Sequence, residues 1–400
     1  MATVGSISLP VLPTVECRYC RTVVPDAGYC GACGAHLVRE GFRASQRLHS
    51  YAAFPDEPVL RVSQISALFP HLSHRAKAPF RAGFGIVIVL IAVLSVAGAS
   101  APLLAVCALG VPLLFVLYLV EVDPYEESFA IPSGVAILLG AGLGAGWALI
   151  ASPYVDRALQ PSPVASLTDG RTLGAAILVP GIAQLLMCVP LVVIRLLLRG
   201  RLESLDGFAA GSTGALGFTL ASTITLLAPW LGNGQLLHLP ITTSLAQAVF
   251  RGLTWPLVSA MVTGLVGATW SKRLGTGPTS ARGRWLTSPA LALLAALVVQ
   301  IGLGFAALAR LPETVLILTN ILAIAAVILV VRIVLHHVLL HEAQVAQIGP
   351  PRACPQCSHL VPSMPFCPNC GICDRALARP VRGPAPSPIP HDPSEGTVPT

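Results

Sequence analysis

Long apolar segments fill the middle of the chain, and polar residues collect at its two ends. Eight apolar stretches are each long enough to cross a bilayer, which needs about 20 helical residues. They lie near 83–99, 101–120, 129–150, 173–198, 208–231, 246–270, 286–309 and 315–335. The first two meet at Ser100-Ala101-Pro102, where the pattern predicts a helical hairpin. We therefore expect an all-α polytopic membrane protein with about eight transmembrane helices.

The composition favours the same class of protein. Of the 400 residues, 54% are hydrophobic and 11% are charged. A soluble domain carries about 25% charged residues, so this chain has too few to cover a water-exposed surface. The net charge of +7 fits the excess of Arg and Lys in the cytoplasmic loops of membrane proteins.

The basic residues predict how the chain is oriented in the membrane. With eight spans, they cluster on one side: before the first span, in two later loops and at the end of the last span. They are Arg39, Arg43, Arg47, Arg61, Arg75, Lys77, Arg81, Arg195, Arg199, Arg201, Lys272, Arg273, Arg282, Arg284 and Arg332. The opposite loop 232–245 carries no charge. We expect a multi-pass protein of the inner (plasma) membrane with both termini in the cytoplasm.

Most of the cysteines belong to an internal repeat near the two ends of the chain. The clusters are Cys17-x2-Cys20-x9-Cys30-x2-Cys33 and Cys354-x2-Cys357-x9-Cys367-x2-Cys370. An aromatic residue (Tyr29, Phe366) precedes each third cysteine, and a glycine (Gly34, Gly371) follows each fourth. Paired CxxC motifs at this spacing are typical of zinc ribbons, which are short β-hairpins that hold one metal ion.

The spacing predicts two structural zinc ions, each bound by four cysteines. The expected ligands are Cys17, Cys20, Cys30 and Cys33 for one ion, and Cys354, Cys357, Cys367 and Cys370 for the other. Four protein ligands close a zinc site, so neither site should bind a catalytic water. Disulfides or a redox CxxC are the alternative, which needs an oxidising compartment. Ribbons this small should be unfolded without metal. Cys373 lies outside both sets and is interpreted as a spare thiol.

These features divide the chain into five parts. We expect a zinc ribbon at 1–37, a linker with an interfacial helix at 38–82, the membrane domain at 83–342, a second ribbon at 350–373 and a disordered tail at 374–400. In the third span, the pairs Gly140-x3-Gly144 and Gly142-x3-Gly146 predict close helix packing.

The spans lack the usual signs of catalysis. No span has a central Asp or Glu, and the ionisable residues Arg195, Arg251 and Arg332 lie near span ends. His337 and His341 stand four residues apart beside Glu342, but HExxH is incomplete there. We interpret them as part of an interfacial helix end.

Spans four to six carry a set of residues that resembles a known family. Pro180 is followed by Ala183-Gln184, Asp206-Gly207 opens span five, Phe218 is followed four residues later by Ser222, and span six holds Arg251, Pro256, Ser259 and Thr263. This order resembles the PrsW family of glutamic-type intramembrane proteases, relatives of the CAAX-protease superfamily, over roughly 130–270. The family has EExxK, FxxxE and a histidine where this chain has Gln184, Ser222 and Ser259.

The resemblance implies a degenerate member that keeps the scaffold and lacks the catalytic groups, so no catalytic residue is expected. The layout with flanking ribbons, and the phrase Leu117-Tyr118-Leu119-Val120-Glu121-Val122-Asp123-Pro124-Tyr125-Glu126-Glu127, resemble a group of actinobacterial zinc-ribbon membrane proteins.

The favoured hypothesis is a non-catalytic membrane scaffold, sensor or adaptor whose ribbons bind a cytoplasmic or membrane protein. One alternative is an active protease with rearranged residues, using Glu126 and Glu127, and another is a transporter or channel. Lipid contact follows from the spans. Nucleic acid is not an expected partner, because the second ribbon has no Lys or Arg from Cys354 to Cys370.

Overall fold

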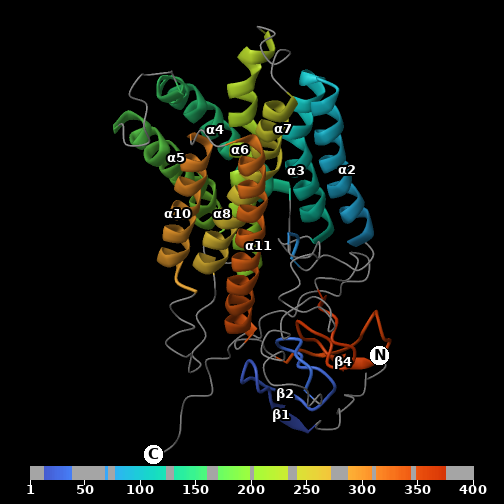
Figure 1. Cartoon of the computed structure of the whole chain (residues 1–400). Coiled ribbons are helices and arrows are strands. Elements are labelled where there is room, and N and C mark those ends of the chain that lie inside the picture. Colours follow the sequence, from blue (N-terminus) through green and yellow to red (C-terminus); the bar gives the residue numbers. More distant parts are fainter. Residues whose placement is uncertain are drawn as a thin grey trace, which may run out of the picture.

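The computed structural model is a helical bundle with two small two-stranded sheets beside one of its ends (Figure 1). It describes residues 13–37, 68–70, 77–122, 130–159, 170–198, 202–232, 241–271, 287–308, 312–343 and 348–374. The predicted interfacial helix in 38–82, apart from 68–70 and 77–82, lies outside the described residues. So does the predicted tail beyond residue 374.

Helices cover every apolar stretch that the sequence predicted. They are α2 (Lys77–Val96), α3 (Ser100–Val122), α4 (Ala130–Leu159), α5 (Gly170–Leu197), α6 (Ser204–Gly232), α7 (Ile241–Val249), the π-helix η3 (Phe250–Thr254), α8 (Trp255–Ser271), α10 (Pro289–Leu308) and α11 (Glu313–Ala343). Within the described residues, 6 helical segments are long and apolar enough to cross a membrane, with α7, η3 and α8 counted as one. The chain is therefore a multi-pass membrane protein, whereas the count of eight spans stays a prediction.

A tight turn joins α2 and α3 where the sequence predicted a hairpin. The turn contains Gly98, whose φ of +66° suits glycine. Pro102 lies in the first turn of α3, where a missing backbone N–H breaks no helical hydrogen bond. The predicted breakpoint at Ser100 is therefore the start of the second helix.

Helix α6 lies at the centre of the bundle. Every residue from Ser204 to Thr219 is buried, and α4 and α8 pack along it on two sides. Its polar side chains therefore face protein, as when the Ser212 hydroxyl donates to the carbonyl of Ala260 at 2.9 Å.

Glycines bring α4 and α6 into backbone contact. A Cβ atom at Gly140 would overlap the carbonyl oxygen of Gly214, and one at Gly144 would overlap that of Phe218. Among the described residues, nothing lies within 4 Å of such a Cβ atom at Gly142 or Gly146. The predicted packing role is thus right for the first glycine pair and wrong for the second, because residues two positions apart lie on different helix faces.

A π-helical turn interrupts the rod formed by α7 and α8. The amide of Trp255 donates to the carbonyl of Phe250, five residues earlier. Pro256 follows at once, and a proline ring would clash with the carbonyl four residues before it in a regular α-helix. The π-turn relieves this clash, and it contains Arg251.

Helix α11 is longer than the sequence predicted. The expected span ended at residue 335, whereas α11 continues to Ala343. The added turns are stabilised by protein contacts, because Val338 and Leu339 are buried. Arg332 therefore lies within the helix and not at its end.

Replacing Gly144 by Ala should destabilise the bundle by about 1–3 kcal/mol, the usual cost of forcing extra atoms into a packed core. The new methyl group would meet the backbone of Phe218, which cannot rotate away. Thermal unfolding of the purified protein in detergent micelles measures the difference.

The matched control is Gly142→Ala, which places the same methyl group in open space on the same helix. It should unfold at or slightly above the temperature of the unmodified protein. Equal destabilisation by both changes would contradict the contact between α4 and α6.

Candidate metal centres

Each cysteine cluster is built on a short antiparallel hairpin. In the first ribbon, β1 (Thr14–Glu16) pairs with β2 (Val23–Pro25), and in the second, β3 (Pro351–Ala353) pairs with β4 (Leu360–Pro362). The registers are equivalent, with Val15 opposite Val24 and Arg352 opposite Val361. The first two cysteines of each cluster lie in the turn between the paired strands.

The turns that present the sulfur atoms are also repeated. The carbonyl of Cys17 accepts from the amide of Arg21 at 2.8 Å, and that of Cys354 accepts from Ser358 at 2.7 Å. In the second turn, Gly34 and Gly371 have φ values of 73° and 72°. These left-handed values explain why a glycine follows each fourth cysteine.

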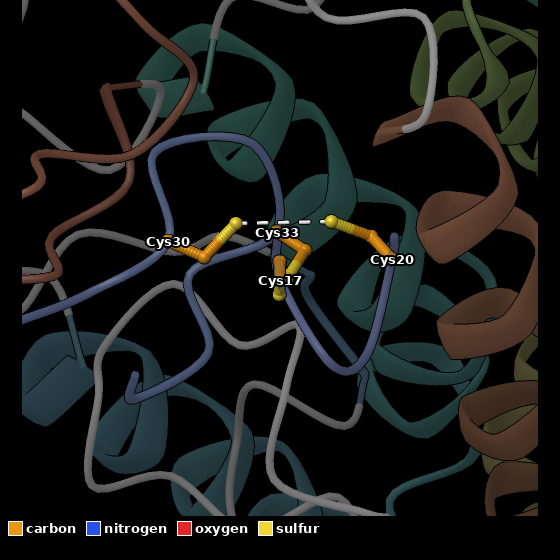
Figure 2. Close-up of side chains that lie close together, drawn as sticks. All are labelled: Cys17, Cys20, Cys30 and Cys33. Carbon is orange, nitrogen blue, oxygen red and sulfur yellow. Dashed lines mark hydrogen bonds between the residues drawn. The ribbon is translucent and has the colours of Figure 1, made fainter. Parts of the chain in front are cut away.

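The eight predicted cysteines meet in two four-sulfur clusters. The Sγ atoms are 3.7 Å apart for Cys17 and Cys33 and 3.7 Å apart for Cys20 and Cys30 (Figure 2). The corresponding pairs of the second ribbon, Cys354 with Cys370 and Cys357 with Cys367, are both 3.8 Å apart.

These separations fit a tetrahedral metal ion. A tetrahedron with zinc–sulfur bonds of about 2.3 Å places its sulfur atoms about 3.8 Å apart. A disulfide bond would need about 2.05 Å, and all of these cysteines are free thiols. Each cluster can therefore hold one thiolate-binding ion such as zinc. Cys373 stays outside the second cluster, in a backbone bridge with Phe366.

The two clusters differ in their access to solvent. All four cysteines of the first cluster are at most 1% exposed. In the second, Cys354 and Cys367 are buried but Cys357 and Cys370 are partly exposed. Burial raises the pKa of the Cys357 thiol, but hydrogen bonds from the Asn369 side chain and the His359 backbone outweigh it and bring the pKa to about 6. Cys357 is therefore a thiolate at neutral pH, the form that binds metal.

The two ribbons pack against each other. The amide of Tyr29 donates to the carbonyl of Pro368 at 2.9 Å, and the amide of Phe366 donates to that of Gly31 at 2.8 Å. Tyr29 and Phe366 occupy the same position in the repeat, as do Gly31 and Pro368. The two bonds are therefore equivalent, and the ribbons are related by an approximate twofold axis.

The first ribbon also contacts the end of α11. The Thr22 hydroxyl donates to the carbonyl of Ala343 at 3.4 Å, which satisfies a helix-end carbonyl that has no partner within the helix. Ala343 and Leu340 pack against the core of this ribbon, to which Met364 of the second ribbon also contributes. Both ribbons therefore form one unit at one end of the bundle (Figure 1).

Inside the bundle, Gln184, Ser222 and Ser259 take part in hydrogen bonds within and between helices. Gln184 on α5 donates from Nε2 to Oγ1 of Thr263 on α8 at 3.2 Å. Ser259 on α8 accepts from Nε2 of Gln300 on α10 at 2.9 Å. The Ser222 hydroxyl donates to the carbonyl of Thr219 on its own helix at 3.1 Å.

Gln184 therefore contacts α8 at Thr263, one helical turn from Ser259. Ser222 instead bonds within its own helix, α6. Gln300 was missed by sequence reasoning, although a lone amide in the apolar stretch 286–309 could have indicated a buried contact. It is fully buried, as are Gln184, Ser259 and Thr263.

The histidines of α11 give no metal centre with three or more ligands among the described residues, where only the two cysteine clusters do so. The ring centroids of His336 and His337 are 5.6 Å apart. The sequence had pointed to His337 and His341, and not to His336.

Comparison with protein-family models, curated proteins and solved structures gives no match.

A chelator should remove metal from the second ribbon before the first, because only the second has partly exposed cysteines. With the zinc-loaded protein in micelles and a chromophoric chelator in excess, release should be biphasic with equal amplitudes. Stopped-flow absorbance measures both phases.

Combined Cys354→Ser and Cys357→Ser changes should abolish the fast phase, and combined Cys17→Ser and Cys20→Ser changes should leave a fast phase. If the Cys354→Ser and Cys357→Ser changes abolished the slow phase and kept the fast one, the fast phase would belong to the first ribbon, and the prediction would be wrong.

Proposed function

We propose that the chain is a non-catalytic membrane scaffold or adaptor, whose two zinc ribbons form a single protein-binding module on the cytoplasmic face. The observation that carries this proposal is the equivalent pairing of the ribbons at the end of α11. Two closed metal sites that join into one body offer a rigid surface and no open coordination position for chemistry.

The choice of zinc rests on the ligand chemistry. Four thiolates at tetrahedral spacing suit zinc, whose closed four-cysteine sites are structural. Such an ion would hold the two cysteine turns of each short hairpin together.

The interior of the bundle supports a non-catalytic role. In the PrsW-like arrangement, two acids and a histidine would activate water, but Gln184, Ser222 and Ser259 do not titrate near neutral pH. Their side chains are buried and already take part in hydrogen bonds within the bundle. We therefore propose that this region is a protease-like scaffold that has become a packing core.

The cytoplasmic orientation rests on the basic residues near the ribbon side. At that end of the bundle, the guanidinium of Arg195 donates to the carbonyl of Trp270 at 2.8 Å and lies 5.2 Å from the centre of the Trp270 ring. Lys77 and Arg81 lie at the start of α2. An excess of such residues marks the cytoplasmic side.

The scaffold role is tested by photo-crosslinking from Leu360, which is 68% exposed on the second ribbon. A photoreactive residue there should crosslink to a defined protein in intact cells. Combined Cys17→Ser and Cys20→Ser changes should abolish that product, because the module would lose a metal site.

The matched control is Ser222→Ala, which should leave the crosslinked product unchanged. Cleavage of a transmembrane substrate by the purified protein, lost on Ser222→Ala or Ser259→Ala, would contradict the non-catalytic role. Loss of function in cells on Glu126→Gln with Glu127→Gln would favour the rearranged protease instead.

The orientation is tested separately by protease accessibility. In inside-out membrane vesicles, added protease should cut tags fused to both ends of the chain, because the vesicle exterior is the former cytoplasmic face. In right-side-out spheroplasts both tags should be protected. Protection of either tag in inside-out vesicles would contradict the assignment.

A further inference from the structure

We propose that the two metal sites are thermodynamically coupled, so that metal in one ribbon raises the affinity of the other. The inference rests on metal binding by both cysteine clusters, as proposed above, but not on the scaffold role. Its basis is that the surfaces joining the ribbons are built from the same turns that hold the metal ligands.

One aromatic ring from each ribbon contacts the other ribbon. A Cβ atom on Gly371 would lie 2.7 Å from Cδ1 of Tyr29, and one on Gly34 would lie 2.6 Å from Cδ1 of Phe366. Each ring therefore rests directly on the bare backbone of a glycine in the other ribbon. Each glycine follows the fourth cysteine of its own cluster, so the ring covers the turn that presents this sulfur atom.

The backbone bonds between the ribbons involve the same turns. Gly31, which accepts from Phe366, lies between Cys30 and Cys33, and Pro368, which accepts from Tyr29, lies between Cys367 and Cys370. The donors Tyr29 and Phe366 immediately precede the third cysteine of their clusters. Every residue of these two bonds thus lies in or beside a pair of metal ligands.

The interface between the two ribbons is therefore not independent of the turns that hold the metal ligands. A four-cysteine turn is ordered when an ion gathers its sulfur atoms, and small ribbons lose their fold without metal. When the second ribbon is unfolded, the ring of Phe366 and the carbonyl of Pro368 no longer support the knuckle of the first ribbon. Ordering that knuckle then depends on its own ion alone, so the ion binds more weakly.

Thermodynamic linkage requires that the two metal sites affect each other's affinity equally. If metal at one site changes the affinity of the other by some factor, the reverse factor must be the same. Such couplings between sites typically amount to about 5–150-fold. The intrinsic affinities need not be equal, because only the first ribbon has the contact between Thr22 and Ala343.

The experiment uses the full-length protein in lipid nanodiscs, stripped of metal and titrated with Zn²⁺ against a chromophoric chelator. The Cys354→Ser and Cys357→Ser changes leave the first site, and the Cys17→Ser and Cys20→Ser changes leave the second. The dissociation constant of each remaining site should be at least about fivefold higher than in the intact protein, by the same factor in both.

Tyr29→Ala tests the contact itself without altering any ligand. It should weaken zinc binding at the second site, although its side chain belongs to the first ribbon. This effect should vanish when Cys17 and Cys20 are serine, because the first ribbon is then already unfolded. Tyr29→Phe keeps the ring on Gly371 and should behave like the unmodified protein, which shows that loss of folding is not the cause.

Leu360→Ala is the control for a ribbon change outside the contact, because Leu360 is exposed, and it should leave both dissociation constants unchanged. The coupling is overturned if each site keeps its affinity when the other is removed, or if the two factors differ. Failure of the unmodified protein to bind two zinc ions would contradict the metal assignment instead, and metal analysis distinguishes this result.

Discussion

The missing side chain of glycine is the constraint on which both halves of this structure depend. Where α4 crosses α6, the carbonyls of Gly214 and Phe218 occupy the space that a Cβ atom at Gly140 or Gly144 would need. Between the ribbons, Gly34 and Gly371 leave bare backbone on which an aromatic ring can lie. Without these positions, the central helix could not be enclosed and the ribbons could not pair.

The sequence predicted the parts better than their assembly. The cysteine spacing predicted both clusters, since CxxC pairs in a hairpin gather four sulfur atoms wherever the hairpin lies. The pairing of the ribbons was not predicted, because it joins residues such as Tyr29 and Gly371 from opposite ends of the chain. The hydrophobic pattern predicted the long helices of the described residues but underestimated α11, whose last turns carry the buried side chains Val338 and Leu339.

The interior of the bundle shows a second limit of sequence reasoning. The identity of a polar residue in an apolar stretch does not tell whether it takes part in catalysis or in helix packing. Gln300 was overlooked, and it donates to Ser259 at 2.9 Å. Glycines had a similar ambiguity, since Gly142 and Gly144 belong to overlapping motifs but lie on different faces of α4. Only the position of the neighbouring helix separates such cases.

The pairing of the two ribbons has a consequence for how the protein is made. During synthesis the first ribbon leaves the ribosome long before the second, with the whole membrane domain between them. Until Phe366 and Pro368 have been translated, Gly34 lacks its covering ring and the amide of Tyr29 lacks its acceptor. Closure of this contact therefore marks a chain that has been translated past its second ribbon, and a chain that stopped earlier would leave this surface of its first ribbon uncovered.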